Sequence, residues 1–312
     1  MQNVCTEIQI KIINYLSERE RIRFSEVSKY FLVLIRGYHW YLVLNMSYER
    51  IHPIETVRHL LATYQFQKCH LRLRYDLDEI SYARHVEILD LHASYLTGKN
   101  LHLFDGLLEI SLENCRNITD TAIINLCRNR TNPFRKINLS TCLEITDLSL
   151  DAIARVGCEE LILNRNEKIT DYGVHQVISS GICRKLSLEI CSQITDAAFE
   201  NAIQLRSLNL FTRNIWPKSV LGPSITDLTM KKLKLCQELS LNPECEISDA
   251  GLIELRSCTY LILAYHHLVT SEGLIAVLNY GNIKKLMFNY ENNFDELELE
   301  NMFPDVKIEV LY

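Results

Sequence analysis

Cysteine, histidine and carboxylate side chains are common in this chain, so a catalytic or metal site is the first possibility to consider. The 312 residues include 11 cysteines and 10 histidines. No C-x-x-C pair indicates zinc, and neither G-x-S-x-G nor H-E-x-x-H occurs. Gly98-Lys99 lacks the preceding glycine of a phosphate-binding loop. We therefore predict a protein that is not an enzyme, with no catalytic residue, metal site or cofactor.

Many of the cysteines fall at positions that recur along the chain, where a small buried thiol packs well. Six of them occupy such positions: Cys115, Cys142, Cys158, Cys183, Cys191 and Cys236. We interpret these six as reduced core residues rather than disulfide partners. His266 and His267 follow an expected strand, and we interpret them as surface residues rather than metal ligands.

A helix-start signal is repeated seven times. It first occurs as Ile118-Thr119-Asp120 and returns at Thr146, Thr170, Thr195, Thr226, Ser248 and Thr270. The hydroxyl residue is a typical N-cap, because its oxygen can accept a hydrogen bond from an unpaired N–H group in the first helical turn. The acidic residue that usually follows places negative charge at the positive end of the helix dipole. In every copy an apolar residue before the cap matches another four positions after it, as in a hydrophobic staple.

An alternating apolar phrase precedes each helix start. Leu107-x-x-Ile110-x-Leu112-x-x-Cys115 is the first regular copy, and the next three end at Cys142, Asn166 and Cys191. This is the phrase of a leucine-rich repeat, and N-caps 22 to 31 residues apart fit its length. One strand and one helix per repeat predict an α/β solenoid, with a curved parallel sheet inside and helices outside.

The repeats divide the chain into a short head and a long solenoid. We expect a three-helix head over residues 1–40 and a solenoid over 41–312. In the solenoid we expect degenerate repeats over 41–106, regular repeats over 107–288 and a C-terminal cap over 289–312.

Three strand triplets are expected in the degenerate part, at 42–44, 71–73 and 89–91, and a last strand at 306–310. An insertion runs from Phe211 to Pro223, and its prolines rule out a continuous helix. Two alternatives remain for it, a binding loop or a bulge without function.

The charge distribution bears on the class of partner. The net charge is −6, and residues 286–312 account for it with seven acidic residues and one lysine. There is no basic patch for nucleic acid or an anionic membrane and no long apolar run, and we expect no leader peptide. We expect a cytoplasmic or nuclear protein with neither a nucleic-acid nor a membrane partner. The acidic end is interpreted as a solvated face, with an acidic docking site as the alternative.

The first helix of the head has two apolar sides. At about 100° per residue, Ile8, Ile12 and Leu16 gather on one side, and Ile10 and Ile13 lie nearly opposite. The head itself can cover one side, which leaves the other for a partner or for the first repeat. The sequence leaves open which side faces outward.

The head resembles an F-box. The likeness is carried by Val4-Cys5-x-Glu7-Ile8, by Arg19 to Arg23, by Val27-Ser28-Lys29-x-Phe31 and by Trp40 ahead of a strand. Since repeats with cysteines follow it, the whole chain resembles an F-box/leucine-rich-repeat protein of the cysteine-containing subtype. The family usually opens with Leu-Pro, part of its adaptor-binding surface, where this chain has Val4-Cys5.

This resemblance implies the substrate-recognition subunit of an SCF-type cullin ubiquitin ligase. The head would dock a SKP-type adaptor, and through it a cullin, while the arc would bind a protein substrate. The adaptor-binding residues would be Val4, Cys5, Ile8, Ile12 and Leu16. The alternative is a ligase-independent scaffold or inhibitor, which the absent Leu-Pro favours and the intact Val27-Ser28-Lys29-x-Phe31 disfavours.

The strand residues between the buried leucines are expected on the concave face. They are polar in the early copies, as at Glu109, Ser111 and Lys136, and aromatic or apolar in the later ones. Clustered exposed aromatics are typical interface anchors. We predict a substrate-binding surface formed by Phe211, Tyr260, Ile262, Tyr265, Met287 and Tyr290. The alternative is that the carboxy-terminal end covers these side chains.

Overall fold

The computed structural model describes residues 40–44, 66–71, 86–91, 96–211, 222–280, 282–292 and 294–311, the first two ranges as backbone. The expected head therefore lies outside the described residues, apart from Trp40. The same holds for the five predicted adaptor-binding residues, Val4, Cys5, Ile8, Ile12 and Leu16, and for residues 212–221 of the insertion.

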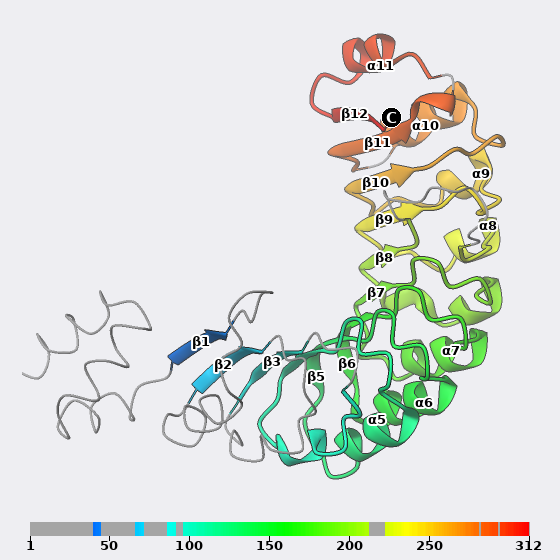
Figure 1. The fold of residues 1–312 in the computed structure, drawn as a ribbon. Coiled ribbons are helices and arrows are strands. Elements are labelled where there is room, and N and C mark those ends of the chain that lie inside the picture. Colours follow the sequence, from blue (N-terminus) through cyan, green and yellow to red (C-terminus); the bar gives the residue numbers. More distant parts are fainter. Residues whose placement is uncertain are drawn as a thin grey trace, which may run out of the picture.

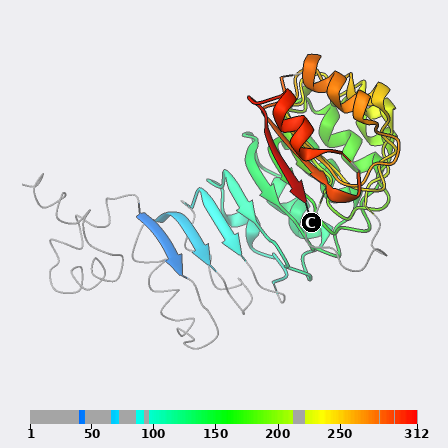
Figure 2. The same cartoon turned by 90° about the horizontal axis from the view of Figure 1, so that it is seen from above.

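Twelve parallel strands in the described ranges form one sheet in chain order (Figure 1). They are β1 (Trp40–Leu44), β2 (Phe66–Leu71), β3 (Ile88–Leu91), β4 (Glu109–Ser111), β5 (Phe134–Asn138), β6 (Cys158–Ile162), β7 (Lys185–Ser187), β8 (Ser207–Asn209), β9 (Glu238–Leu241), β10 (Tyr260–Leu263), β11 (Lys285–Asn289) and β12 (Lys307–Leu311). The sheet lines the inside of an arc and the helices lie outside it (Figures 1 and 2). The α/β solenoid predicted from the repeat phrase is confirmed.

Two strand positions differ from the prediction. In β2, Cys69 and Leu71 pair with Leu89 and Leu91 of β3. The expected triplet at 71–73 was therefore two residues late, because Cys69 takes the position that a leucine occupies in other strands. The last strand begins at Lys307 rather than at residue 306.

All seven helix starts predicted in the repeats coincide with observed ones. The long helices are α5 (Asp120–Cys127), α6 (Asp147–Val156), α7 (Asp171–Ser179) and α10 (Ser271–Tyr280). The short ones are α8 (Asp227–Met230), α9 (Asp249–Leu252), α11 (Glu296–Met302) and the 3-10 helices η2 (Leu101–Leu103), η3 (Asp196–Phe199), η4 (Ala202–Gln204) and η5 (Tyr290–Asn292). All seven expected staple pairs are buried.

The outer layer is thinner than expected in the three repeats that carry η3, α8 and α9. The spacing between a helix start and the next strand gives the reason. Only 12 residues separate Asp196 from Leu208, Asp227 from Leu239 and Asp249 from Leu261, whereas the repeats with long helices have 14 to 17. Since the chain also needs residues to turn back to the sheet, the shorter segments accommodate only about one helical turn.

The aspartates of the helix-start signal link neighbouring repeats. Asp147 accepts one hydrogen bond from the backbone N–H of Thr170 at 2.9 Å and another from its hydroxyl at 2.6 Å. The same pair of bonds recurs from Asp120 to Thr146, Asp171 to Thr195, Asp196 to Thr226, Asp227 to Ser248 and Asp249 to Thr270. We name this series the aspartate ladder. The sequence predicted only a helix-dipole role for these residues.

Each hydroxyl of the ladder also caps its own helix. The six hydroxyls from Thr146 to Thr270 accept a backbone N–H from the first helical turn at 3.1–3.3 Å. Thr119 has the extended backbone of an N-cap, but its side chain makes no capping hydrogen bond. Its predicted capping bond is therefore not found, and residues 91–100 contain no aspartate to hold its hydroxyl.

A small residue always stands two positions after the first residue of the helix, and from the second copy on this position follows a ladder bond to the aspartate of the preceding repeat. These residues are Ala122, Ser149, Gly173, Ala198, Thr229, Gly251 and Gly273. A Cβ atom added to Gly251 would overlap Asp227 Oδ1, and one added to Gly273 would overlap Asp249 Oδ1. This recurring small residue was a sequence signal for the ladder that the helix-start pattern alone did not reveal.

The nine cysteines whose side chains are described are free and buried, which confirms the core interpretation for all six predicted ones. Cysteines that lie a few residues after a strand donate to the preceding repeat, as Cys142 does to the Leu112 carbonyl at 3.1 Å. Cysteines at the start of a strand donate within their own strand, as Cys158 does to the Glu160 carbonyl at 3.0 Å. The cysteines that follow the strands therefore link successive repeats.

Candidate functional site

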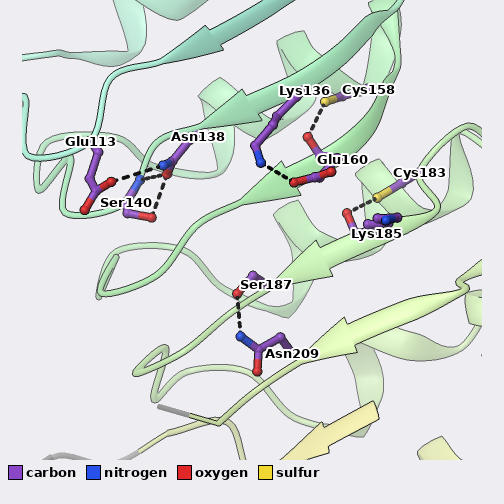
Figure 3. Close-up of polar contacts among 10 residues, drawn as sticks. All are labelled: Glu113, Lys136, Asn138, Ser140, Cys158, Glu160, Cys183, Lys185, Ser187 and Asn209. Atoms are coloured by element: carbon purple, nitrogen blue, oxygen red, sulfur yellow. Dashed lines mark hydrogen bonds and ion pairs between the residues drawn. The ribbon is translucent and has the colours of Figure 1, made fainter. Parts of the chain in front are cut away.

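On the concave face from β4 to β8, polar side chains bond to one another (Figure 3). Lys136 Nζ lies 2.5 Å from Glu160 Oε1 on the next strand. Asn138 Oδ1 accepts the Ser140 hydroxyl at 2.7 Å, and its amide donates to Glu113 at 3.4 Å. Side chains that already satisfy one another have little left to offer a ligand.

The same lattice continues across the next strands. Asn164 Oδ1 accepts from the Ser187 hydroxyl at 2.8 Å and from the Glu189 backbone at 3.0 Å. The Asn209 amide donates to Ser187 Oγ at 3.2 Å and to Glu189 at 2.6 Å. Asparagines at the ends of the strands thus connect one repeat to the next, and we call the face from β4 to β8 the polar half.

We call the face from β10 to β12, together with the residues that directly follow these strands, the aromatic half, and it carries exposed rings. β10 and β11 pair with Leu263 opposite Phe288, and Tyr265 and Tyr290 each lie two residues beyond that pair. The two tyrosines therefore hold equivalent positions in neighbouring repeats. They expose 41% and 56% of their surface, so the exposure predicted from the sequence is found for both.

Tyr260 is half-buried within a network of the same half. Its hydroxyl donates to the Met287 sulfur at 3.2 Å, and Lys285 Nζ lies 5.4 Å from its ring centroid. Glu309 joins Lys285 at 3.1 Å and Lys307 at 2.6 Å. The hydrogen bonds and charges of these two lysines lower the pKa of the Glu309 carboxyl. The charges of the aromatic half are therefore paired among themselves.

The exposure expected for Ile262 and Met287 is wrong. They keep only 6% and 3% of their surface exposed, and Ala264 is buried as well. Ile262 and Met287 are paired residues on adjacent central strands, and the Tyr260 hydroxyl covers the Met287 sulfur. Larger side chains on neighbouring strands cover a short apolar one in such a sheet. Met287 thereby packs against Tyr260.

Phe211 is separated from the tyrosines. It follows β8, whose Asn209 is paired with Ser240 of β9, and β9 lies between β8 and β10. The β9 residues in between, Ser240 and Asn242, are polar and buried. The structure thus places Tyr260 on β10, and Tyr265 and Tyr290 just after β10 and β11, with Phe211 two strands away from β10.

His266 is a residue whose role the sequence reasoning missed. It is 3% exposed, so the predicted surface position is wrong for His266, whereas His267 is exposed. Burial, opposed by the Cys245 carbonyl 3.1 Å from Nδ1 and aided by the charge of His267, lowers the pKa of His266 to about 4. Its backbone N–H donates to Asn292 Oδ1 at 2.8 Å. This backbone bond joins the segment that carries Tyr265 to η5, which begins at Tyr290, and the ring bonds the preceding repeat.

The described residues contain no group of three or more His, Cys, Asp or Glu side chains that could hold a metal ion. Burial raises the pKa of the Cys191 thiol to about 11 and that of Cys258 to about 12. Such thiols stay protonated near neutral pH and are poor nucleophiles. In the same part of the chain, no helix is long and apolar enough to cross a membrane.

The comparison with known proteins agrees with this geometry at the level of the fold. No family model matches the chain. The chain is similar to the crystal structure of an internalin (InlF) from Listeria monocytogenes, at 15% identity and a TM-score of 0.55, over 90% of this chain and 82% of that one.

It also aligns with a chain from the crystal structure of the Rad7 and Elc1 complex in yeast, at 16% identity over 78% of each chain. The TM-score of 0.40 is too low to support a conclusion about fold or function. The repeat phrase, the strand order and the likeness to the internalin together identify the fold of this chain as a leucine-rich-repeat solenoid.

Proposed function

We propose that this protein binds a protein substrate through the aromatic half of its concave face. The observation that carries the proposal is the pair of exposed tyrosines, Tyr265 and Tyr290, at equivalent positions of adjacent repeats. Tyrosine offers a large rigid surface and a hydroxyl group, and it is enriched among the residues that dominate protein interfaces. The paired charges beside the tyrosines favour a partner segment that is largely uncharged.

We further propose that the protein is the substrate-recognition subunit of an SCF-type cullin ubiquitin ligase. The F-box resemblance of the head supports this role, with Val4, Cys5, Ile8, Ile12 and Leu16 as contacts to a SKP-type adaptor. The protein itself would not be an enzyme. It would raise the effective concentration of a substrate near a charged conjugating enzyme, and it would act in the cytoplasm or the nucleus.

The second candidate is a scaffold or inhibitor that works without a ligase. The Val4-Cys5 start favours it, because the family's Leu-Pro contributes to adaptor binding. In this case the head would only cap the solenoid, and the concave face would bind its partner in the same way. The two functions therefore share the aromatic half and differ in the head.

The binding surface is tested with the double variant Tyr265→Ala/Tyr290→Ala. We expect at least a tenfold loss of partner capture in crosslinking pull-downs, since truncating an anchor costs about 1–2 kcal/mol or more. Both rings are exposed, so the thermal midpoint should move by no more than about 3 °C. Adding Tyr260→Ala should deepen the loss.

A matched control alters the polar half, with Glu113→Ala and Lys185→Ala. It should capture the same proteins as the wild type. If the tyrosine variant keeps its partners while the control loses them, the binding surface is in the wrong half.

The role of the head is tested by co-purification with a SKP-type adaptor. The full chain should retain the adaptor, and Ile12→Glu should lose it while remaining folded by circular dichroism. Ile10→Glu, on the opposite side of the expected helix, is the comparison variant. If the folded full chain never retains the adaptor, the ligase function is wrong and the scaffold is favoured.

A further inference from the structure

A groove of about 660 Å³ lies on the outer surface of the solenoid, between α7 and α8. Its apolar lining includes Ile178, Ile203 and Leu228, and the last two expose 52% and 60% of their surface. The groove forms where η3 and η4 replace a longer helix and where α8 has only four residues. The outer layer is thinner at this point, and apolar side chains that a long helix would cover face the solvent.

One rim of this groove is basic. Lys231, Lys232 and Lys234 line it and are exposed, and no ion pair to them is present among the described side chains. Glu200 is the acidic residue of the lining, so the groove carries a net charge of about +2 at neutral pH.

The polar residues of the opposite wall are already paired. Asn201 donates to Ser179 Oγ at 3.1 Å, and Gln204 accepts from Arg184 at 2.6 Å. The three lysines are therefore the part of this surface that is available for new charged contacts. We call it the basic groove.

The complementary surface is at the carboxy-terminal end of the same chain. Helix α11 carries Glu296, Glu298 and Glu300 around Leu297, which exposes 70% of its surface. Among the residues of α11 only Leu299 is buried. An exposed leucine with three carboxylates around it matches an apolar groove with three lysines on its rim, in sign and in polarity. We call it the acidic knob.

We propose that the acidic knob of one molecule docks in the basic groove of a second copy. Within one molecule α9 and α10 lie between α8 and α11 (Figure 1), so the knob and the groove of the same chain are kept apart. The contact joins different surfaces of the two copies and is therefore head-to-tail. Because its charges are exposed and α11 is short, the association is weak and sensitive to salt.

Sedimentation velocity of the full chain tests the proposal. At about 50 mM salt we expect the average mass to rise with protein concentration. At about 500 mM, where the Debye length falls to a few ångströms, the average mass should stay that of the monomer. A wild-type chain that stays monomeric at both salt concentrations overturns the proposal and leaves the groove to an acidic segment of another protein.

Charge reversal identifies the two surfaces. The groove variant carries Lys231→Glu, Lys232→Glu and Lys234→Glu, and the knob variant carries Glu296→Lys, Glu298→Lys and Glu300→Lys. Each alone should lose association by about tenfold or more. An equimolar mixture of the two should recover it, because each variant then meets a partner of opposite charge.

A control reverses Lys99, Arg128 and Lys284, which changes the net charge as much as the groove variant does but lies outside the groove. It should associate like the wild type. Circular dichroism and the thermal midpoint establish that every variant is folded, as expected for exposed residues. Association that persists in the groove variant, or a mixture that stays monomeric, overturns the proposal.

Discussion

The polar half of the concave face, β4 to β8, is closed by hydrogen bonds among its own side chains, whereas the aromatic half, β10 to β12, exposes Tyr265 and Tyr290. Both halves stand on the same frame of stacked strands and aspartate-ladder bonds. The difference shows that the repeat specifies the frame, while the residues between the core leucines are free to specify the surface. Binding is therefore expected in the aromatic half, beyond the hydrogen-bonded side chains of the polar half.

The largest effect is expected at Asp196, which links the last two repeats of the polar half through the outer layer. Its carboxylate accepts bonds from the backbone and hydroxyl groups of both Thr226 and Thr229. Asp196→Ala leaves these four donors without their acceptor and should cost on the order of 4 kcal/mol of unfolding free energy in urea titrations. Asp305→Ala, at an exposed position, is the control and should change little.

The pH dependence of this effect has a definite sign. Burial of the Asp196 carboxyl alone would raise its pKa, but the bonds from Thr226 and Thr229 outweigh burial and hold the pKa below its ordinary 3.8. The stabilisation is therefore complete above that value and is lost as the pH falls through the lower folded pKa. A cost of Asp196→Ala that is equal at pH 7 and at about pH 2 would contradict the ladder.

An acid-dependent difference between the halves is expected next, from His266. Its pKa is about 4 in the folded protein against 6.5 ordinarily, so unfolded chains bind more protons between these values. Stability should fall by about 3 kcal/mol as the pH drops through this window. Hydrogen exchange at about pH 4.5 should open residues 245–292 before residues 109–189.

His266→Asn keeps a donor for the Cys245 carbonyl and removes the titrating ring. This variant should show a flatter stability profile across the window from pH 6.5 to about 4. Equal acid sensitivity in the variant and the wild type would mean that another group is responsible.

The smallest effect is expected from Lys136→Ala in the polar half. Lys136 and Glu160 are partly exposed, with 38% and 30% of their side chains accessible. Such a pair contributes about 0–1 kcal/mol, so the melting temperature should change by only a few degrees and partner capture should not change. A large loss of capture would show that the polar half takes part in binding.

Much of the frame and part of the site could be predicted from the sequence. The seven helix starts, the buried staples and the core cysteines were predicted correctly, and so was the exposure of Tyr265 and Tyr290. Each of these features depends on residues within one repeat. The burial of Ile262 and Met287 could not be predicted in this way, because their neighbouring strands lie about 25 residues away in the chain.

The sequence by itself determined where the helix of each regular repeat begins and, to within two residues, where the strands lie, because alternation and capping act over a few residues. Only the tertiary structure decided what the aspartates bind, which side chains of the later strands are buried and where the outer layer thins into a groove. These outcomes depend on which side chains of successive repeats are brought within hydrogen-bonding or packing distance. The spacing of repeats along the chain does not contain that information until the solenoid is stacked.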